Sequence, residues 1–227
     1  MSEAPVPPHV LPRKRLAAAA AILFALVVVM GLRVHDGNRP LRVDRQATRV
    51  VDSPKVSQAL AAADLGGGGS KSMFQKAADL GSPYLVLGVA VVSGLVAVAR
   101  RDLVAAKICV TGPLLAIGLT ELVGKPLVDR HLHQTLAFPS GHATDAGVVA
   151  ALVLVLVFRW AGSRSLALGM PFGVAVPLFV SIAVVGLGRH YATDAVAGVA
   201  VGVASVLAVS AMFREPTVVD AVVPASV

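Results

Sequence analysis

The feature that most restricts the fold of this chain is a series of long apolar runs, each almost free of charged residues. Most of them are close to the roughly 20 residues that a helix needs to cross a bilayer, where only helices and closed barrels satisfy their backbone groups. The composition, 56% hydrophobic and 15% charged with mean hydropathy +0.78, is also too apolar for an ordinary soluble domain. We therefore predict an all-α, polytopic membrane bundle of about six transmembrane helices, over residues 16–32, 80–99, 103–120, 143–158, 165–188 and 195–213.

The first of these runs could instead be the apolar core of a signal peptide. No convincing small-x-small cleavage site follows it, so an uncleaved span is favoured. The fourth run is short unless its helix begins at Ser140, which is a good N-cap residue. The chain is thereby divided into a tail (1–15), a first span (16–32), a polar loop (33–79), a membrane core (80–213) and a second tail (214–227).

The polar loop 33–79 is the largest segment outside the predicted spans. It contains the stretch Gly66-Gly67-Gly68-Gly69-Ser70, a flexible linker by composition, and Ser57–Asp64, which could form a short surface helix. The sequence assigns no function to it.

Basic residues in the short connections predict the orientation. They lie on one side of a six-span chain, which the positive-inside rule makes cytoplasmic together with both tails; they are Arg13-Lys14-Arg15, Arg100-Arg101, Arg159 with Arg164, and Arg214. The loop 33–79 is itself basic and falls outside, but its length is near the limit at which loop charge still governs topology. We expect a multi-pass protein of the cell membrane with its site on the extracytoplasmic face.

The net charge of +7 and the pI near 10.2 raise the question of a nucleic-acid partner. The Arg and Lys residues lie between apolar runs and form no aromatic-interleaved patch, so anionic lipid headgroups are the more natural partner. Cys109 is the only cysteine, which excludes an intrachain disulfide. The oligomeric state is not encoded in any visible pattern.

Chemically competent side chains gather on the predicted outer face, in the loop from Glu121 to His142 and in the turn at Arg189-His190. Four of the six histidines lie in these two segments, together with basic and acidic groups: His131, His133, His142, His190, Lys125, Arg130, Arg189 and Asp194. Polar groups at membrane depth indicate function by default. Within Phe138-Pro139-Ser140-Gly141-His142, a glycine admits close approach to the backbone and a capped helix N-terminus attracts phosphate.

Three ordered segments resemble the motifs of the type 2 phosphatidic acid phosphatase superfamily, which includes membrane lipid phosphatases and vanadium haloperoxidases. They are Lys125-Pro126-Leu127-Val128-Asp129-Arg130, Phe138-Pro139-Ser140-Gly141-His142, and His190-Tyr191-Ala192-Thr193-Asp194-Ala195-Val196-Ala197-Gly198. The resemblance covers roughly residues 80–213. Their order within a six-span frame makes it more specific than any single motif.

The resemblance implies catalytic roles for His190, His142 and Asp194. His190 would be the nucleophile that attacks phosphorus and forms a phosphohistidine, and His142 the general acid that protonates the leaving oxygen. Asp194 lies four residues after His190, a spacing that on a helix would let its carboxylate accept the Nδ1–H bond and leave Nε2 free to attack.

The resemblance also implies a set of phosphate-binding residues, with two departures from the family pattern. Ser140 and the Gly141 backbone would hold phosphate oxygens, and Lys125 would stabilise charge on the transferred phosphoryl group. Leu132 and His133 stand where motif one usually has a basic residue followed by proline, and Val184 stands where an arginine usually precedes motif three. Arg130 and Arg189 are the candidate substitutes.

We therefore expect a metal-independent phosphatase without a cofactor that hydrolyses a phosphomonoester or pyrophosphate on a lipid. A phosphorylated sugar on a polyprenyl carrier is an alternative substrate, and haloperoxidase activity is disfavoured in so apolar a frame. His131-x-His133 could bind zinc with His142 or His190, but no cysteine lies near and supporting carboxylates are not obvious. From another class, a catalytically silent lipid-binding or scaffold protein is supported by the missing arginines.

Overall fold

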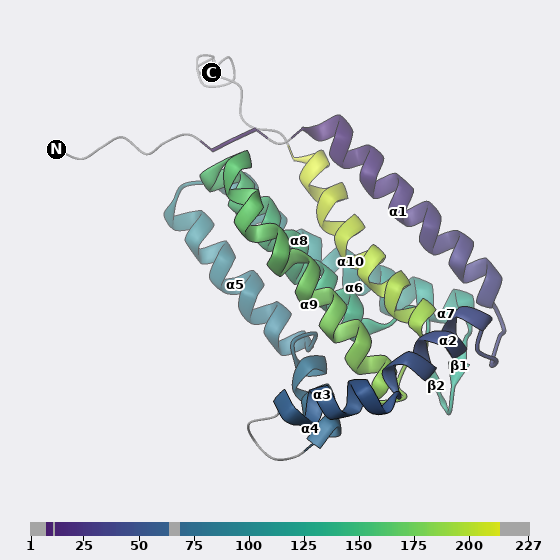
Figure 1. The fold of residues 1–227 in the computed structure, drawn as a ribbon. Helices are drawn as coiled ribbons and strands as arrows, with labels where there is room; N and C mark the ends of the chain where they lie inside the picture. Colours follow the sequence, from purple (N-terminus) through teal and green to yellow (C-terminus); the bar gives the residue numbers. More distant parts are fainter. Residues whose placement is uncertain (1–7, 11, 64–68, 214–227) are drawn as a thin grey trace, which may run out of the picture.

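The computed structural model describes residues 8–10, 12–63 and 69–213, and shows a bundle of long helices with short elements gathered at one end (Figure 1). Six helical segments in the described residues are long and apolar enough to cross a membrane: Arg13–Val34, Gly69–Ala99, Leu103–Val128, Gly141–Ala161, Ser163–Gly186 and Ala192–Met212. The predicted all-α membrane bundle is confirmed. Residues 1–7 and 11 of the first predicted tail and all of the second, 214–227, lie outside the described residues. Residues 64–68, around the predicted linker, also lie outside them.

The elements follow one another along the chain as α1 (Arg13–Val34), α2 (Arg42–Val51), α3 (Pro54–Ala63), α4 (Gly69–Asp79), α5 (Pro83–Ala99), α6 (Leu103–Ile117), η1 (Gly118–Gly124), α7 (Lys125–Val128), β1 (His131–Leu132), β2 (Thr135–Leu136), α8 (Gly141–Ala161), η2 (Ser163–Ser165), α9 (Leu166–Gly186) and α10 (Ala192–Met212). The strands β1 and β2 form an antiparallel hairpin. The polar loop 33–79 is thus largely helical. Residues 57–63 of the predicted surface helix Ser57–Asp64 lie in α3, and Asp64 lies outside the described residues.

The predicted end of the third span is wrong. The third span does not end at Thr120, because the chain continues as the π-helix η1 and then α7. Two charged residues one turn apart make this possible: the Lys125 Nζ atom lies 2.6 Å from Glu121 Oε1 and 2.7 Å from Oε2. Because each charge neutralises the other at helical spacing, the helix tolerates both, and Lys125 lies on a helix rather than in a loop.

The helices α8 and α10 form the centre of the bundle and approach each other closely at three glycines. A Cβ atom added at Gly147 would lie 2.7 Å from the Val199 carbonyl oxygen, and Cβ atoms at Gly198 and Gly202 would collide with the backbone of Ser140 and Thr144. Small residues at a helix–helix contact allow such approach inside a membrane. These glycines therefore fix the distance between the helices that carry two of the motifs.

Replacing Gly202 by valine is expected to destabilise the protein by about 1–3 kcal/mol, because the side chain has no space against α8. The midpoint of thermal unfolding in detergent measures this effect. Gly88→Ala is the matched control, because a Cβ atom at Gly88 in α5 meets nothing within 4 Å. Equal midpoints for the two variants would contradict the packing argument.

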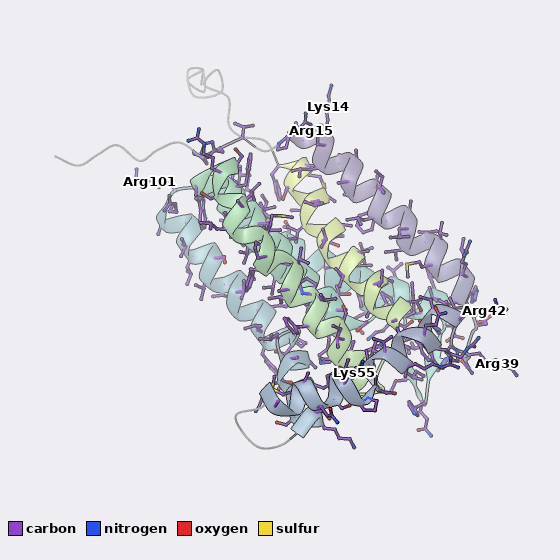
Figure 2. All side chains as sticks on the ribbon, in the orientation of Figure 1. Lys14, Arg15, Arg39, Arg42, Lys55 and Arg101 are labelled. Carbon is purple, nitrogen blue, oxygen red and sulfur yellow. The ribbon has the colours of Figure 1, made fainter. Side chains whose placement is uncertain are left out.

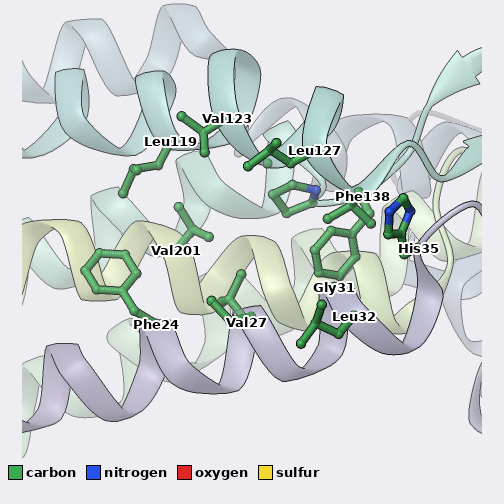
Figure 3. A pocket seen from close by; sticks show the side chains of 14 residues that line it. Phe24, Val27, Gly31, Leu32, His35, Leu119, Val123, Leu127, Phe138 and Val201 are labelled. Carbon is green, nitrogen blue, oxygen red and sulfur yellow. The ribbon is translucent and has the colours of Figure 1, made fainter.

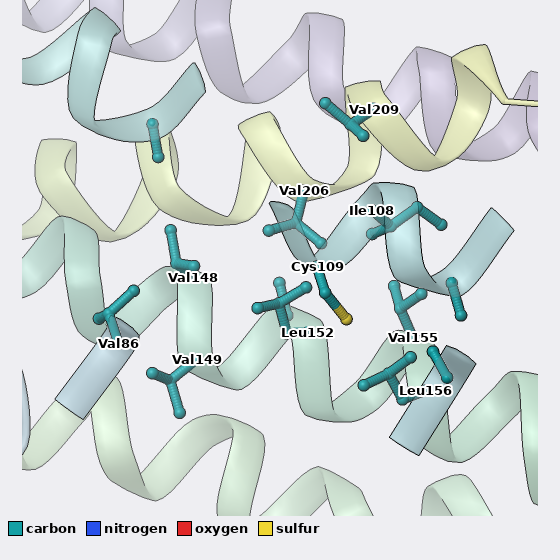
Figure 4. Close-up of a cluster of buried hydrophobic side chains, with 14 of the residues drawn as sticks. Val86, Ile108, Cys109, Val148, Val149, Leu152, Val155, Leu156, Val206 and Val209 are labelled. Carbon is teal, nitrogen blue, oxygen red and sulfur yellow. The ribbon is translucent and has the colours of Figure 1, made fainter. Parts of the chain in front are cut away.

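Apolar side chains from α5, α6, α8 and α10 fill the middle of the bundle (Figure 4). A second cluster lies at the end that carries the short elements, where Phe74 and Ala78 of α4 pack with Ala143 of α8 and with Val180 and Val184 of α9. The segment 33–79 is therefore packed onto the membrane core. Many large apolar side chains on the outer faces stay exposed, as expected for a surface in contact with lipid.

Basic side chains lie at both ends of the bundle (Figure 2). Lys14, Arg15 and Arg101 lie at one end, and Arg39 and Lys55 lie at the other, beside the short elements. At the first end Arg159 is buried and pairs with Asp102, with 2.6 Å between Nη2 and Oδ1. Burial alone would raise the pKa of Asp102, but bonds from Arg159 outweigh it and hold the pKa below its usual value.

Candidate active site

The three motif segments meet at the end of the bundle that carries α2, α3 and α4. Backbone hydrogen bonds join motifs two and three directly, since the Ser140 N–H donates to the Asp194 carbonyl at 3.0 Å. Ala137, just before motif two, accepts a hydrogen bond from the His190 ring at 2.9 Å. The structure therefore brings His142 and His190 to one end of the molecule, as the sequence predicts.

His190 precedes α10, and its hydrogen bond settles which ring nitrogen is free. Its Nδ1 faces the Ala137 carbonyl oxygen, which can only accept, so Nδ1 carries the hydrogen and Nε2 of the neutral ring keeps its lone pair. Burial is the largest cause that lowers the pKa of His190 to about 4; nearby groups, including Lys125 and Arg189, act in the same direction, and the bond to Ala137 acts against them. The imidazole is therefore neutral near pH 7.

Asp194 does not contact the His190 Nδ1, so the predicted hydrogen bond between them is wrong. As the third residue of α10, its carboxylate turns back toward the start of the helix, and Oδ2 accepts the Tyr191 N–H at 2.9 Å. Oδ1 accepts from Arg130 Nη1 at 2.6 Å. Asp194 therefore fixes the backbone next to His190 rather than its ring.

His142 lines a pocket of about 270 Å³ between three spans. The lining comes from Pro83 of α5, Ile117 of α6, Thr120 and Glu121 of η1, and Gly141, His142, Thr144 and Asp145 of α8. A Cβ atom at Gly81 would collide with the His142 carbonyl, so the turn before α5 packs directly against α8 here. The pocket opens beside the N-terminus of α8, where free N–H groups favour an anion.

Ser140 is the N-cap of α8, as predicted, and its Oγ accepts the Ala143 N–H at 3.4 Å. The residue is fully buried, so its side chain is not accessible for the predicted contact with a phosphate. Gly141 is half-buried and lines the pocket. Of this pair, Gly141 alone is placed to face a ligand.

Two carboxylates in the pocket were not predicted as site residues. Glu121 pairs with Lys125, and the Asp145 residue is only 6% exposed although it lines the pocket. The signal for Asp145 was its position three residues after His142, which places both side chains on one helix face.

Arg130 was predicted to bind phosphate, and the structure contradicts this. The residue is completely buried, and its guanidinium is held by Asp194, Asp44 and Thr193. A side chain enclosed in this way is not available to a ligand in the pocket. Arg189 is exposed, and its Nη2 donates to Gln75 Oε1 of α4 at 2.9 Å, so it lies near the site without lining the pocket.

Comparison with known proteins decides the family. A family model described as the PAP2 superfamily matches residues 84–217, more than half of the chain. The chain belongs to the PAP2 superfamily. The fold is similar to the crystal structure of the first transmembrane PAP2 type phosphatidylglycerolphosphate phosphatase from Bacillus subtilis, with a TM-score of 0.59 and 18% identity over 84% of this chain and 94% of that one. No curated protein matches the sequence significantly.

The structure places the residues at both departures from the usual PAP2 motifs. Val184, where an arginine is usual, is fully buried, and its carbonyl oxygen accepts the backbone N–H groups of Arg189 and His190 at 3.0 and 3.3 Å. It therefore shapes the turn before motif three. Leu132 lies in the β1–β2 hairpin.

The two histidines of that hairpin, His131 and His133, do not form a metal-binding arrangement. The His131 ring faces the Asp129 carbonyl, and His133 is exposed in the turn with a positive φ of 57°. Across residues 8–10, 12–63 and 69–213, no group of three or more His, Cys, Asp or Glu side chains could hold a metal ion. The alternative zinc site therefore gains no support from the geometry of this PAP2 protein.

Proposed function

We propose that this PAP2 protein hydrolyses a phosphomonoester or pyrophosphate on a lipid through a phosphohistidine. Family membership supports a lipid phosphatase kind of function. The observation that carries the proposal is the neutral His190 ring, whose hydrogen bond to Ala137 leaves Nε2 unprotonated. His190 does not itself line the pocket, but it lies near enough to His142, which does, for the charge of His142 to lower its pKa.

In the first step the His190 Nε2 lone pair attacks phosphorus and a P–N bond forms. The bond between phosphorus and the leaving oxygen breaks, and His142 in its protonated form gives that oxygen a proton. In the second step water attacks phosphorus, neutral His142 takes its proton, and the P–N bond breaks. Inorganic phosphate leaves, and both imidazoles return to their starting states.

Positive groups around the pocket would hold the phosphoryl group. Lys125 would exchange Glu121 for a phosphate oxygen, a local movement because the two side chains are paired at the pocket rim. The backbone N–H at Gly141 and the N-terminus of α8 would bind another oxygen. Arg189, an exposed side chain that donates a hydrogen bond to Gln75, would turn toward the added charge.

An apolar cavity near the site supports a lipid substrate (Figure 3). It has a volume of about 260 Å³ and lies between α1 and the η1–α7 segment, with side chains such as Phe24, Leu119 and Phe138 pointing into it. Gly124 and Pro139 also line it, and each directly precedes a residue of the candidate site. Hydrocarbon near the headgroup would be accommodated there without desolvating polar groups.

A substrate panel tests the proposal. Purified protein in detergent is assayed for phosphate release from phosphatidate, from a polyprenyl pyrophosphate and from a water-soluble phosphomonoester, each with and without EDTA. We expect release from at least one lipid phosphate, with EDTA leaving the rate unchanged. Release no faster than the blank on every lipid phosphate would favour the catalytically silent lipid-binding or scaffold protein.

The rate should resist acid more than an ordinary histidine would allow. Because the pKa of His190 is lowered to about 4, its nucleophilic neutral form persists at about pH 5, where an imidazole of ordinary pKa near 6.5 is mostly protonated. The acid limb of kcat/KM due to His190 is therefore expected near pH 4. The ionisation of the substrate phosphate is measured separately and divided out. A corrected acid limb near pH 6.5 would contradict the proposed state of the ring.

We place the site on the extracytoplasmic face because the short basic connections, which govern orientation under the positive-inside rule, lie at the other end of the bundle. An impermeant maleimide applied to intact cells should then label His133→Cys in the hairpin and leave Arg101→Cys unlabelled, since both positions are exposed at opposite ends. Cys109 is buried and gives little background. Labelling of Arg101→Cys alone would reverse the orientation.

A further inference from the structure

The segment between the first two spans contributes a buried acid to the candidate site. Asp44 of α2 is completely buried and accepts three hydrogen bonds, all at 2.9 Å: from the Leu41 N–H, the Thr193 N–H and Arg130 Nη2. Burial alone would raise the pKa of Asp44, but these donors outweigh it and hold the pKa below its usual value. Asp44 is therefore ionised and bonded directly to the first turn of α10.

Arg130 is the centre of this network. Its Nη1 donates to Asp194 Oδ1 at 2.6 Å and to Thr193 Oγ1 at 2.7 Å, and its guanidinium lies 4.2 Å from the centre of the Tyr191 ring. Because Nη2 of the same guanidinium pairs with Asp44, Arg130 joins α2 to the start of α10. One buried cation thus connects a segment outside the membrane core to motif three.

Two short paths lead from Arg130 to His190. Along the first, Arg130 holds Asp194, whose Oδ2 accepts the N–H of Tyr191, the residue after His190. Along the second, the Arg130 carbonyl accepts the Ala137 N–H at 2.7 Å, and the Ala137 carbonyl accepts the His190 ring at 2.9 Å. The side chain of Arg130 therefore helps to fix the backbone beside the imidazole, and its main chain helps to fix the group that orients the ring.

We infer that Asp44 and Arg130 are positioning residues for His190, so that the segment 33–79 is part of the catalytic unit. The inference rests on the proposed function. Neither side chain reaches the phosphate pocket, so both act through the direction of the His190 ring and not through substrate binding. Loss of the ion pair should therefore lower kcat and leave KM nearly unchanged.

Asp44→Asn is the sharpest test, because asparagine keeps the volume but has only one acceptor oxygen. Its NH₂ group must face either Arg130 Nη2 or the Thr193 N–H, both of which are donors. We expect kcat to fall by about 10- to 100-fold, the size of effect seen when a reacting group is slightly misplaced or loses its supporting shell, with KM within about threefold. Asp52→Asn, an exposed acid at the end of α2, is the matched control.

Thermal unfolding in the same detergent separates positioning from folding. If the wild type is active and Asp44→Asn has the same kcat, the inference is overturned and the proposed function stands. This holds even if the variant has a lower unfolding midpoint. If Asp44→Asn does not fold, Thr193→Ala takes its place, because it removes only one acceptor of Arg130. The criterion is the same: a lower kcat at a nearly unchanged KM. A wild type inactive on every lipid phosphate would overturn the proposed function and this inference with it.

Discussion

His190→Ala is expected to abolish phosphate release, with a loss on the order of 10³-fold or more in kcat. The imidazole is the only side chain that forms a bond to phosphorus in the proposed reaction, and alanine leaves no lone pair in its place. The wild type should also form an acid-labile phosphoenzyme on brief mixing with labelled substrate, and the variant should not. Rapid-quench assays of the purified proteins measure both quantities.

His131→Ala controls for the loss of a histidine on the same end of the bundle, since the His131 ring faces the carbonyl and the carboxylate of the neighbouring Asp129. It should retain wild-type kcat. Unfolding midpoints of both variants must lie near that of the wild type, so that lost activity reflects chemistry. A His190→Ala protein that still releases phosphate at an appreciable fraction of the wild-type rate would exclude the phosphohistidine mechanism.

Arg130→Met is expected to lower the free energy of unfolding by about 3–5 kcal/mol, the usual effect of removing one partner of a buried ion pair. Methionine approximates the apolar stem but leaves Asp44 and Asp194 buried without the cation between them. Both carboxylates must then take up a proton or draw in water. Denaturant unfolding in mixed micelles, monitored by Trp160 fluorescence, measures the change.

The matched control is Arg42→Met, because Arg42 is an exposed arginine on α2. It should change the free energy of unfolding by less than about 0.5 kcal/mol, as for most surface substitutions. The loss of free energy of unfolding in Arg130→Met should also become smaller at acid pH. As the pH falls through the pKa of Asp44 in the variant, the carboxylate takes up a proton and is no longer a buried charge. A loss equal to that of Arg42→Met would mean that the buried charges do not depend on Arg130.

Much of this protein was predictable because the physical signals are local. A run of apolar residues specifies a membrane helix wherever it lies in the chain, and Ser140 caps α8 through atoms three residues away. The extension of the third span through Lys125 was not predicted, because a polar composition usually marks a loop. The pairing of Lys125 with Glu121 is what allows the helix to continue there.

The partners of charged groups were not predictable in the same way. Spacing suggested that Asp194 would contact His190, but the Asp194 carboxylate is taken by the Tyr191 N–H and by Arg130, 64 residues away. Arg130 looked available for phosphate only because the sequence gives no sign that α2 would bring Asp44 to it across 86 residues.

Local patterns in the chain are enough to specify a membrane bundle of six spans and the short list of side chains from which a phosphatase site could be built. How those side chains pair depends on tertiary packing, which places Ala137 against His190 and Arg130 between two acids. The reason is physical: helix formation depends on neighbours a few residues apart, whereas a buried charge takes whichever partner packing brings within about 3 Å.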